Sequence, residues 1–271
     1  MRTALSALFI ATIALTGNSQ LVELPKPPGL TRAAVYFSVT PDSTPRAVLV
    51  FCPGMNGDGS SMVQREEWKQ FARDNNLALA GLCFSSEPRD LDNDKGYTSV
   101  EIGSGQTLLT AIDSQTQRKD IPLILVGFSS GAYFVRNMAG WCPDRISTWI
   151  AWGSSFDSRM TTRLSPGLIV CGDKDYTRWG GAFLRFKRDR STGSPVLWLS
   201  LAGKGHQWAD EVVPFLRQYI KACLDRDGSG CWVDVETKSP LTPAIAKAQP
   251  ALSGWMPDAS LVPTWEQLHT P

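Results

Sequence analysis

Short runs of consecutive apolar residues alternate along the chain with segments whose apolar residues recur at helical spacing. Uninterrupted apolar runs of about four to eight residues indicate strands buried on both faces of a sheet. The predicted strands are 33–39, 47–52, 77–84, 122–126, 146–152, 168–171 and 196–201, the predicted helices are 66–75, 104–112, 132–138, 183–188 and 210–224, and 91–103 is a predicted polar loop. This alternation predicts an α/β fold, with a mostly parallel sheet flanked by helices.

The N-terminal segment departs from this pattern. Arg2 precedes an apolar run without charge, Ala4–Leu15, and small and polar residues follow. That order is typical of a secretory signal peptide, and the run is too short to cross a bilayer comfortably. We therefore predict a signal peptide over 1–20, a secreted or periplasmic protein, and no stable membrane anchor.

The C-terminal segment also departs from the pattern. A main domain is predicted over residues 21–230, and residues 231–271 are rich in Pro and Trp without strong periodicity. Tryptophans favour packing over disorder, because each ring has a large apolar area to bury. We predict an extension that packs on the surface of the domain, with Trp255 and Trp265 as its hydrophobic anchors.

The charge of the chain limits its possible binding partners, and its cysteines limit its possible disulfides. The chain has 27 basic and 26 acidic residues and a formal net charge of +1, which gives no reason to expect nucleic acid or an anionic membrane as a partner. Hydrophobic residues make up 42% of the chain, as in an ordinary globular protein. Export would permit disulfides among the six cysteines. The turn-rich segment between Cys223 and Cys231 makes these two the predicted pair.

A G-x-S-x-G motif at residues 127–131 joins the predicted strand 122–126 to the predicted helix 132–138. In this strand–turn–helix setting the turn is tight and forces the Ser129 backbone into a strained conformation. The two glycines avoid collisions of Cβ atoms with the neighbouring strand and helix. The Ser129 hydroxyl then projects above the sheet near the positive end of the helix, which predicts that Ser129 is a nucleophile.

A serine hydroxyl is a poor nucleophile unless a base takes its proton, and the chain has only two histidines. His269 lies two residues from the C-terminus. His206 follows the last predicted strand of the main domain and precedes the closing helix 210–224. A loop there lies at the carboxyl edge of the sheet, the same edge as the Ser129 turn. His206 is therefore the predicted general base.

The imidazole needs a carboxylate that fixes its tautomer and stabilises its charged form. The predicted strand 168–171 ends in a loop with two acids, Asp173 and Asp175, both after Ser129 and before His206. Asp175 is preferred because a few residues of loop let its side chain turn back toward the imidazole, and Asp173 is the alternative. No ligand motif for a metal is present, so neither a metal nor a cofactor is predicted.

The elbow motif, the chain order Ser129, Asp175, His206 and the strand alternation resemble the α/β-hydrolase superfamily, of the serine esterase type, over about residues 45–222. In that family the acid commonly stands three positions after a glycine at a strand end, as Asp175 stands after Gly172. The resemblance implies hydrolysis of a carboxylic ester through an acyl-enzyme intermediate.

The same resemblance implies an oxyanion hole made of two backbone amides. One is the amide that follows the nucleophile, here that of Ser130. The second comes from the loop after an earlier strand, which often begins His-Gly in the family, whereas Pro53 stands at the His position in this chain. Met55 is the implied second donor, and Asn56 is the alternative.

The predicted site has no cap domain. Family members with a cap usually insert it between two strands that are separated here by residues 153–167, too short a segment for a helical lid. An uncapped site suits a bulky, extended or polymer-borne ester better than a small molecule sealed from water. In being exported and uncapped, the predicted protein is similar to polyhydroxybutyrate depolymerase-like, feruloyl and acetylxylan esterases.

Aromatic residues at the predicted loop ends are candidates for substrate binding, or equally for packing. They are Tyr97, Phe128, Tyr176, Trp179 and Trp208. Two other functions remain as alternatives. A serine peptidase of the same fold would use the same three residues, but commonly adds a propeller or a cap. A non-catalytic binding protein on a hydrolase scaffold would keep the fold without the reaction.

Overall fold

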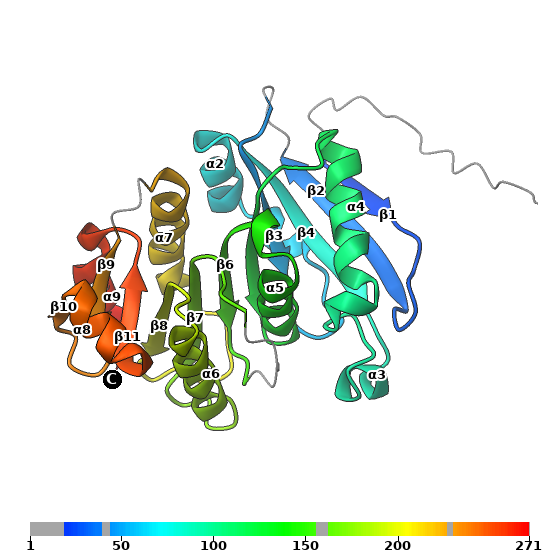
Figure 1. Ribbon diagram of the computed structural model, residues 1–271. Helices are drawn as coiled ribbons and strands as arrows, with labels where there is room; N and C mark the ends of the chain where they lie inside the picture. The colour runs from blue at the N-terminus through cyan, green and yellow to red at the C-terminus, as the bar shows by residue number, and fades with distance from the viewer. Residues whose placement is uncertain (1–18, 40–43, 156–161, 227–229, 271) are drawn as a thin grey trace, which may run out of the picture.

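An eight-stranded sheet, in the order β1-β2-β4-β3-β5-β6-β7-β8, runs through the molecule (Figure 1). It is seen in a computed structural model that describes residues 19–39, 44–155, 162–226 and 230–270. Its strands are β1 (Gln20–Glu23), β2 (Arg32–Val39), β3 (Ala47–Cys52), β4 (Leu77–Ser85), β5 (Leu123–Phe128), β6 (Ile146–Trp152), β7 (Gly167–Gly172) and β8 (Val196–Leu201). Strands β3 to β8 are parallel, and β1 and β2 join one edge in antiparallel pairing. The predicted α/β class is confirmed.

Helices flank the sheet and connect most of the successive parallel strands. They are α1 (Ser60–Val63), α2 (Glu66–Asp74), α3 (Pro88–Asp92), α4 (Ser104–Thr116), α5 (Ser130–Trp141), α6 (Trp179–Ser191), α7 (Val213–Asp225), α8 (Pro243–Ala248) and α9 (Val262–Leu268). Short 3₁₀ helices are η1 (Val100–Ile102), η2 (Pro143–Arg145), η3 (Asp210–Val212), η4 (Pro250–Leu252) and η5 (Ala259–Leu261). The sequence located α2, α4, α5 and α7 but indicated only the middle of α6, residues 183–188, because Gly180 and Gly181 obscure its first turn.

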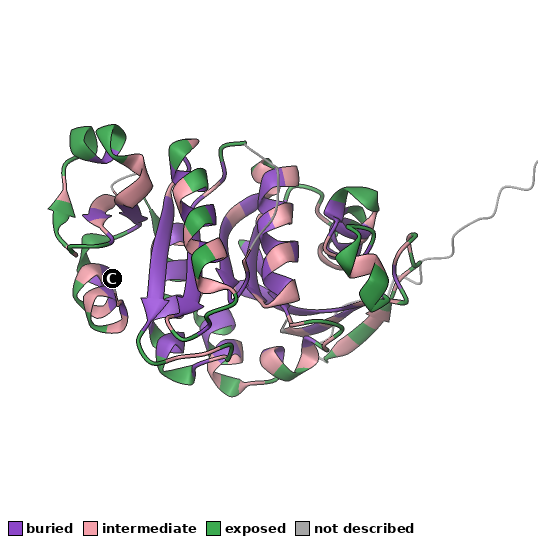
Figure 2. Cartoon of the chain, turned by 90° about the horizontal axis from the view of Figure 1, so that it is seen from below, coloured by how far each residue is buried: buried purple, intermediate pink, exposed green. Residues whose placement is uncertain are grey.

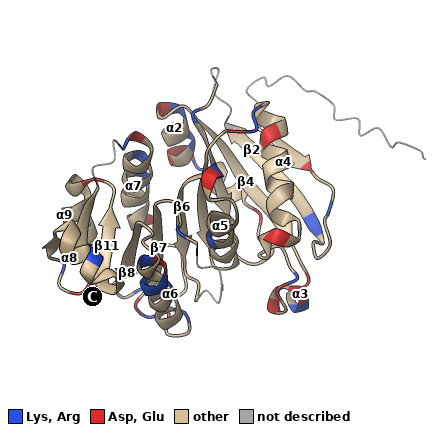
Figure 3. Cartoon of the chain, viewed as in Figure 1, with Lys and Arg blue, Asp and Glu red and all other residues tan. Residues whose placement is uncertain are grey.

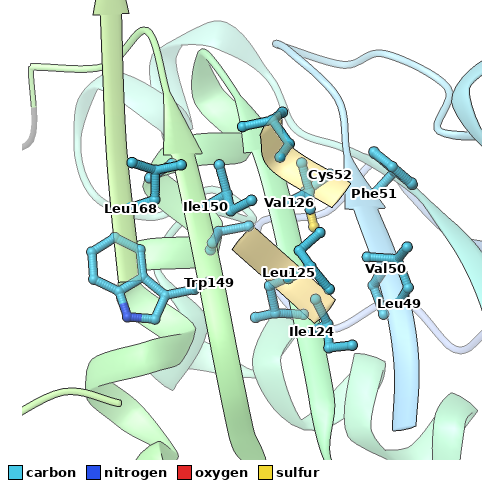
Figure 4. Close-up of a cluster of buried hydrophobic side chains, with 14 of the residues drawn as sticks. Leu49, Val50, Phe51, Cys52, Ile124, Leu125, Val126, Trp149, Ile150 and Leu168 are labelled. Atoms are coloured by element: carbon cyan, nitrogen blue, oxygen red, sulfur yellow. The ribbon is translucent and has the colours of Figure 1, made fainter. Parts of the chain in front are cut away.

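Strands β3, β7 and β8 are buried at every residue, and β5 and β6 at all but one each, as the uninterrupted apolar runs require. Figure 2 shows the sheet as the buried layer, with the exposed residues on the outer helices and loops. Leu49, Leu125 and Ile150, from three neighbouring strands, are fully buried in the cluster shown in Figure 4. This rigid layer fixes where the strand ends, and hence the loops beyond them, lie.

Because β3 to β8 are parallel, the loops after their carboxyl ends all meet at one edge of the sheet. The elbow after β5, the acidic loop after β7 and the His206 loop after β8 all belong to this edge. Only residues 153–166 separate β6 from β7, so no large cap domain is inserted there.

The C-terminal segment covers the β8 edge of the sheet. It contains a three-stranded sheet, in the order β10 (Pro240–Leu241), β9 (Cys231–Asp234), β11 (Ser253–Met256), which the sequence pattern did not indicate. Trp265 is fully buried and its indole N–H donates to the carbonyl of Trp198, 2.9 Å away on β8. Trp255 is 7% exposed. In Figure 1 this orange and red segment lies beside β8, at the opposite end of the sheet from β1.

The predicted signal peptide lies almost wholly outside the described residues, which begin at residue 19. The first described element is β1, which pairs with β2 through Gln20 and Phe37. Within the described part of the chain, no helix combines the length and the apolar character that a membrane span requires.

The predicted disulfide between Cys223 and Cys231 is absent, and all six cysteines are free. Cys223 is buried on the inner face of α7 beside Thr148 and Tyr219, whereas Cys231 begins β9 and pairs with Met256. The two side chains therefore belong to different elements, Cys223 to α7 and Cys231 to β9. The prediction was wrong because turn-forming residues between two cysteines do not determine whether the two side chains point toward each other.

Candidate active site

The elbow after β5 holds Ser129 in a backbone conformation that side chains rarely adopt, with φ of 55° and ψ of −121°. A Cβ on Gly127 would lie 2.3 Å from the carbonyl oxygen of Gly131, and a Cβ on Gly131 would lie 2.0 Å from that of Cys52. Both positions therefore exclude any larger residue. The Ser129 amide donates to the Trp152 carbonyl at 2.8 Å, which ties the elbow to β6.

Three side chains from three loops form one hydrogen-bonded chain. The Ser129 hydroxyl lies 3.0 Å from Nε2 of His206, and Nδ1 of His206 lies 2.9 Å from Oδ2 of Asp175. With the ring proton on Nδ1, the imidazole donates to the carboxylate and leaves Nε2 free to accept from the hydroxyl. The side chain of Asp175 is 3% exposed and that of His206 is 28% exposed. The base is thus reachable from solvent, whereas the acid is shielded.

Asp175 is the acid that reaches the histidine, and it is itself held by neighbours. Its second oxygen, Oδ1, accepts from Arg178 at 3.1 Å and from the Thr177 hydroxyl at 3.2 Å. Asp173 does not contact the imidazole, and its buried Oδ1 has no hydrogen-bond partner in the described part of the chain. Arg178 and Thr177 were not identified from the sequence, since an Arg three residues after an acid is common in any turn.

The acidic loop and the His206 loop are joined to each other by backbone contacts. The Lys174 amide donates to the Lys204 carbonyl at 2.8 Å. A Cβ on Gly172 would lie 2.2 Å from that same carbonyl oxygen, so the close approach of the two loops depends on this glycine. The relative position of Asp175 and His206 is therefore fixed by backbone as well as by side chains.

Aromatic rings support the imidazole from behind. The ring of His206 stacks on Phe128 with centroids 4.9 Å apart, and Trp208 stacks on Trp152 at 4.6 Å and meets Phe128 edge-on. A Cβ on Gly153, whose φ is +70°, would lie 3.2 Å from the imidazole. Of the predicted substrate contacts, Phe128 thus packs on the histidine and Trp208 packs on Phe128 and Trp152.

The two backbone amides implied by the resemblance are both available. Neither the Met55 amide nor the Ser130 amide donates to another group in the described part of the chain. Ser130 is the first residue of α5, where an amide has no partner within its helix and the helix dipole is positive. A Cβ on Gly54 would lie 3.5 Å from Cβ of Ser129, so the loop after β3 runs beside the nucleophile.

The other predicted substrate residues divide into interior and surface positions. Tyr97 is 2% exposed and belongs to the interior, which corrects its prediction as a substrate contact. Trp179 is half-buried, packs on Trp198 and donates to the Ser200 hydroxyl at 3.0 Å. Tyr176 is 83% exposed beside Asp175, so it remains a candidate for substrate contact. The sequence shows only an aromatic residue near a loop end in each case, and this does not distinguish a buried ring from a half-buried or an exposed one.

Acidic and basic residues occur over the whole length of the molecule in Figure 3, with basic residues most frequent on α6. Two charged pairs lie next to the site, Arg178 with Asp175 and Lys204 with Glu211. Among the described residues no cluster of three or more His, Cys, Asp or Glu side chains could hold a metal ion. Burial raises the pKa of Cys171 to about 12 and that of Cys83 to about 11, so both remain protonated thiols.

Comparison with solved structures identifies the fold as that of the α/β-hydrolases. The chain is similar to esterase PE8 (18% identity, TM-score 0.56, 74% of this chain and 99% of that one) and to a thermostable carboxyl esterase from Bacillus coagulans (12%, 0.56, 77% and 100%). It is also similar to the fluorophosphonate-binding serine hydrolase F of Staphylococcus aureus (12%, 0.55, 77% and 100%). No protein-family model and no curated protein matches the sequence.

Proposed function

We propose that this protein is a serine hydrolase that cleaves carboxylic esters, with Ser129 as nucleophile, His206 as general base and Asp175 as the supporting acid. The observation that carries the proposal is the unbroken chain of hydrogen bonds from Ser129 through His206 to Asp175, at 3.0 and 2.9 Å. The three solved structures named above are esterases and a serine hydrolase by name, which supports the same class of reaction.

The first half of the reaction forms an acyl-enzyme. Nε2 of His206 takes the hydroxyl proton of Ser129 while the oxygen attacks the ester carbonyl carbon, and the carbonyl oxygen becomes an oxyanion. The amides of Met55 and Ser130 donate to that oxyanion. When the tetrahedral intermediate breaks down, the imidazolium returns the proton to the leaving alcohol, and the acyl group stays on Ser129.

The second half reverses these roles with water. His206 takes a proton from a water molecule as the water oxygen attacks the acyl carbon. The same two amides hold the second oxyanion, and the proton then passes to Ser129 as the carboxylic acid leaves. Asp175 stays ionised throughout and stabilises the imidazolium in both halves. Two oxyanion donors of this kind typically supply about 3 kcal/mol each of transition-state stabilisation.

The substrate proposed is a bulky, extended or polymer-borne ester. Two observations support this choice: no large cap is inserted between β6 and β7, and Met55 and Tyr176, 55% and 83% exposed, are apolar side chains beside the site. An open site with exposed apolar side chains accommodates an alcohol or acyl part that extends beyond the reacting ester.

Export of the protein to the periplasm or the medium is part of the proposal. It depends on the apolar run Ala4–Leu15 after Arg2, which lies outside the described residues. Fractionation of the producing cells, together with the mass of the mature N-terminus, tests it. A protein found in the cytoplasm with residue 1 or 2 as its N-terminus would contradict export.

Turnover of a panel of acetyl, butyryl, feruloyl and long-chain esters tests the activity. Ester hydrolysis, with labelling of Ser129 by a fluorophosphonate, is the expected result, and Ser129→Ala should abolish both. Cleavage of peptide substrates with no ester turnover would instead identify a peptidase. A wild-type protein that neither turns over esters nor reacts with the fluorophosphonate would contradict the proposal.

A further inference from the structure

The loop between β3 and α1 carries the Met55 amide on a turn closed by the bond from the Gly57 amide to the Gly54 carbonyl, 2.9 Å long. The third residue of this turn is Asn56, whose φ is 55°. Asparagine tolerates this left-handed conformation better than most side chains. The conformation alone does not fix the turn in space, since a turn held by one hydrogen bond can still move as a unit.

The side chain of Asn56 anchors the turn to the neighbouring strand. Its amide group donates to the carbonyl of Ser86 at 2.9 Å, and its carbonyl oxygen accepts from the amide of Ser86 at 2.9 Å. The two bonds together satisfy the backbone of Ser86 just beyond the end of β4. A pair of bonds to one residue fixes both the distance and the orientation of the turn.

Ser86, the residue to which Asn56 is anchored, is buried and held by a further hydrogen bond. Ser86 is 2% exposed, and its hydroxyl accepts from the Tyr97 amide at 2.8 Å. The carbonyl of Tyr97 in turn accepts from the hydroxyl of Ser104, which is fully buried. Burial raises the pKa of Tyr97 to about 12, against the opposing effects of hydrogen bonds from the Ser130 side chain and the Asn56 amide. The Tyr97 phenol thus lies between the two segments that carry the oxyanion amides.

We infer that Asn56 is a positioning residue of the oxyanion hole, and that its paired bonds to Ser86, together with the buried Tyr97 phenol, hold the Met55 amide at the distance from Ser129 that the transition state requires. This inference rests on the proposed function. Asn56 acts on the developing oxyanion through the Met55 amide and does not itself touch the reacting atoms. Loss of the anchor should therefore lower kcat with little effect on KM.

The test compares two asparagine-to-glycine substitutions. Asn56→Gly keeps a residue that accepts a φ of 55° and removes only the side-chain bonds. Asn76→Gly is the matched control, because Asn76 has a φ of 50° and donates to the Thr44 carbonyl at 3.0 Å, at the opposite edge of the sheet. We expect kcat to fall about 10- to 100-fold in Asn56→Gly with KM within about twofold, since loss of a whole donor costs about 10²–10³. Asn76→Gly should leave both unchanged.

A boronic acid that forms a tetrahedral adduct on Ser129 gives a second measurement. Its affinity should fall in Asn56→Gly by the same factor as kcat, and also in Tyr97→Phe, which removes the phenol oxygen. Unchanged kcat, a loss equal to that in Asn76→Gly, or a loss confined to KM would each overturn the inference while leaving the proposed function intact. Full activity in Ser129→Ala would instead overturn the proposed function itself.

Discussion

The imidazole of His206 lies flat against the ring of Phe128, with centroids 4.9 Å apart and planes 23° from parallel. Phe128 is the residue immediately before the nucleophile, so the elbow that presents Ser129 also supports the base. Its ring meets Trp208 edge-on, and Trp208 in turn stacks on Trp152 of β6. The position of the imidazole is therefore set from two directions, by the Asp175 carboxylate at Nδ1 and by aromatic packing on its face.

Phe128→Leu should lower kcat about tenfold. Leucine keeps the hydrophobic character but removes the flat surface on which the imidazole rests, and an aromatic pair typically contributes about 0.5–1.5 kcal/mol beyond burial. The orientation of the base affects the transition state more than substrate binding, so KM should change little. Steady-state kinetics on a soluble ester measure the effect. A variant with wild-type kcat would show that the stack contributes packing alone.

Asp175→Asn should reduce kcat about 10³- to 10⁴-fold, whereas Asp173→Asn should change it less than about threefold. Asparagine at position 175 offers a donor to Nδ1 and favours the wrong tautomer, so the base can no longer accept from Ser129. Asp173 makes no contact with His206, and its replacement by an amide keeps the same shape. The ratio of the two kcat values is the measurement, and equal losses in the two variants would contradict the assignment.

The positions of the parallel strands along the chain and the loops of the site could be predicted from sequence because both depend on local patterns. Buried strands read as uninterrupted apolar runs, and the elbow glycines are required by backbone contacts that leave no room for a Cβ. Ser129, Asp175 and His206 come together because the loops that carry them lie at the same edge of the sheet.

Side-chain direction could not be predicted in the same way. Tyr97, Tyr176 and Trp179 all follow or flank predicted elements, yet the first is buried, the second is 83% exposed and the third packs on Trp198. Cys223 and Cys231 are eight positions apart in the sequence, but their side chains belong to different elements, α7 and β9, and both are free. The sheet β9–β11 has strands of two to four residues, too short to show an alternating pattern.

His269 should make the stability of the protein depend on pH below neutrality. Its imidazole is 2% exposed, accepts from the Ser200 amide at 3.0 Å and donates to the Val235 carbonyl at 2.7 Å. Burial lowers the pKa of His269 from 6.5 to about 4. The folded state thus binds fewer protons than the unfolded state between these two values. The contribution of His269 to stability is full above about pH 6.5 and is lost as pH falls toward 4, by at most about 3 kcal/mol.

The free energy of unfolding, measured by urea denaturation at several pH values, tests this dependence. His269→Gln is the informative variant, since an amide can accept from Ser200 and donate to Val235 without titrating in this range. Carboxylates titrate in both proteins, so the difference between wild type and variant isolates the imidazole. That difference should shrink between pH 6.5 and 4. A constant difference would show that the buried imidazole is not the group responsible.

Gly153→Ala and Gly203→Ala together separate backbone strain from displacement of the catalytic base. Both glycines have a φ of +70°, so an added Cβ costs each about 1 kcal/mol of stability. A Cβ at position 153 would also lie 3.2 Å from Cε1 and Nδ1 of His206, closer than ordinary packing allows, whereas one at position 203 would meet nothing within 4 Å. The imidazole must therefore shift by a few tenths of an ångström in Gly153→Ala alone.

Thermal unfolding should show similar losses in both variants, and kcat should fall about tenfold only in Gly153→Ala, because small misplacements of a catalytic group are costly. Equal kcat values at equal stability would mean that the base tolerates the added methyl group.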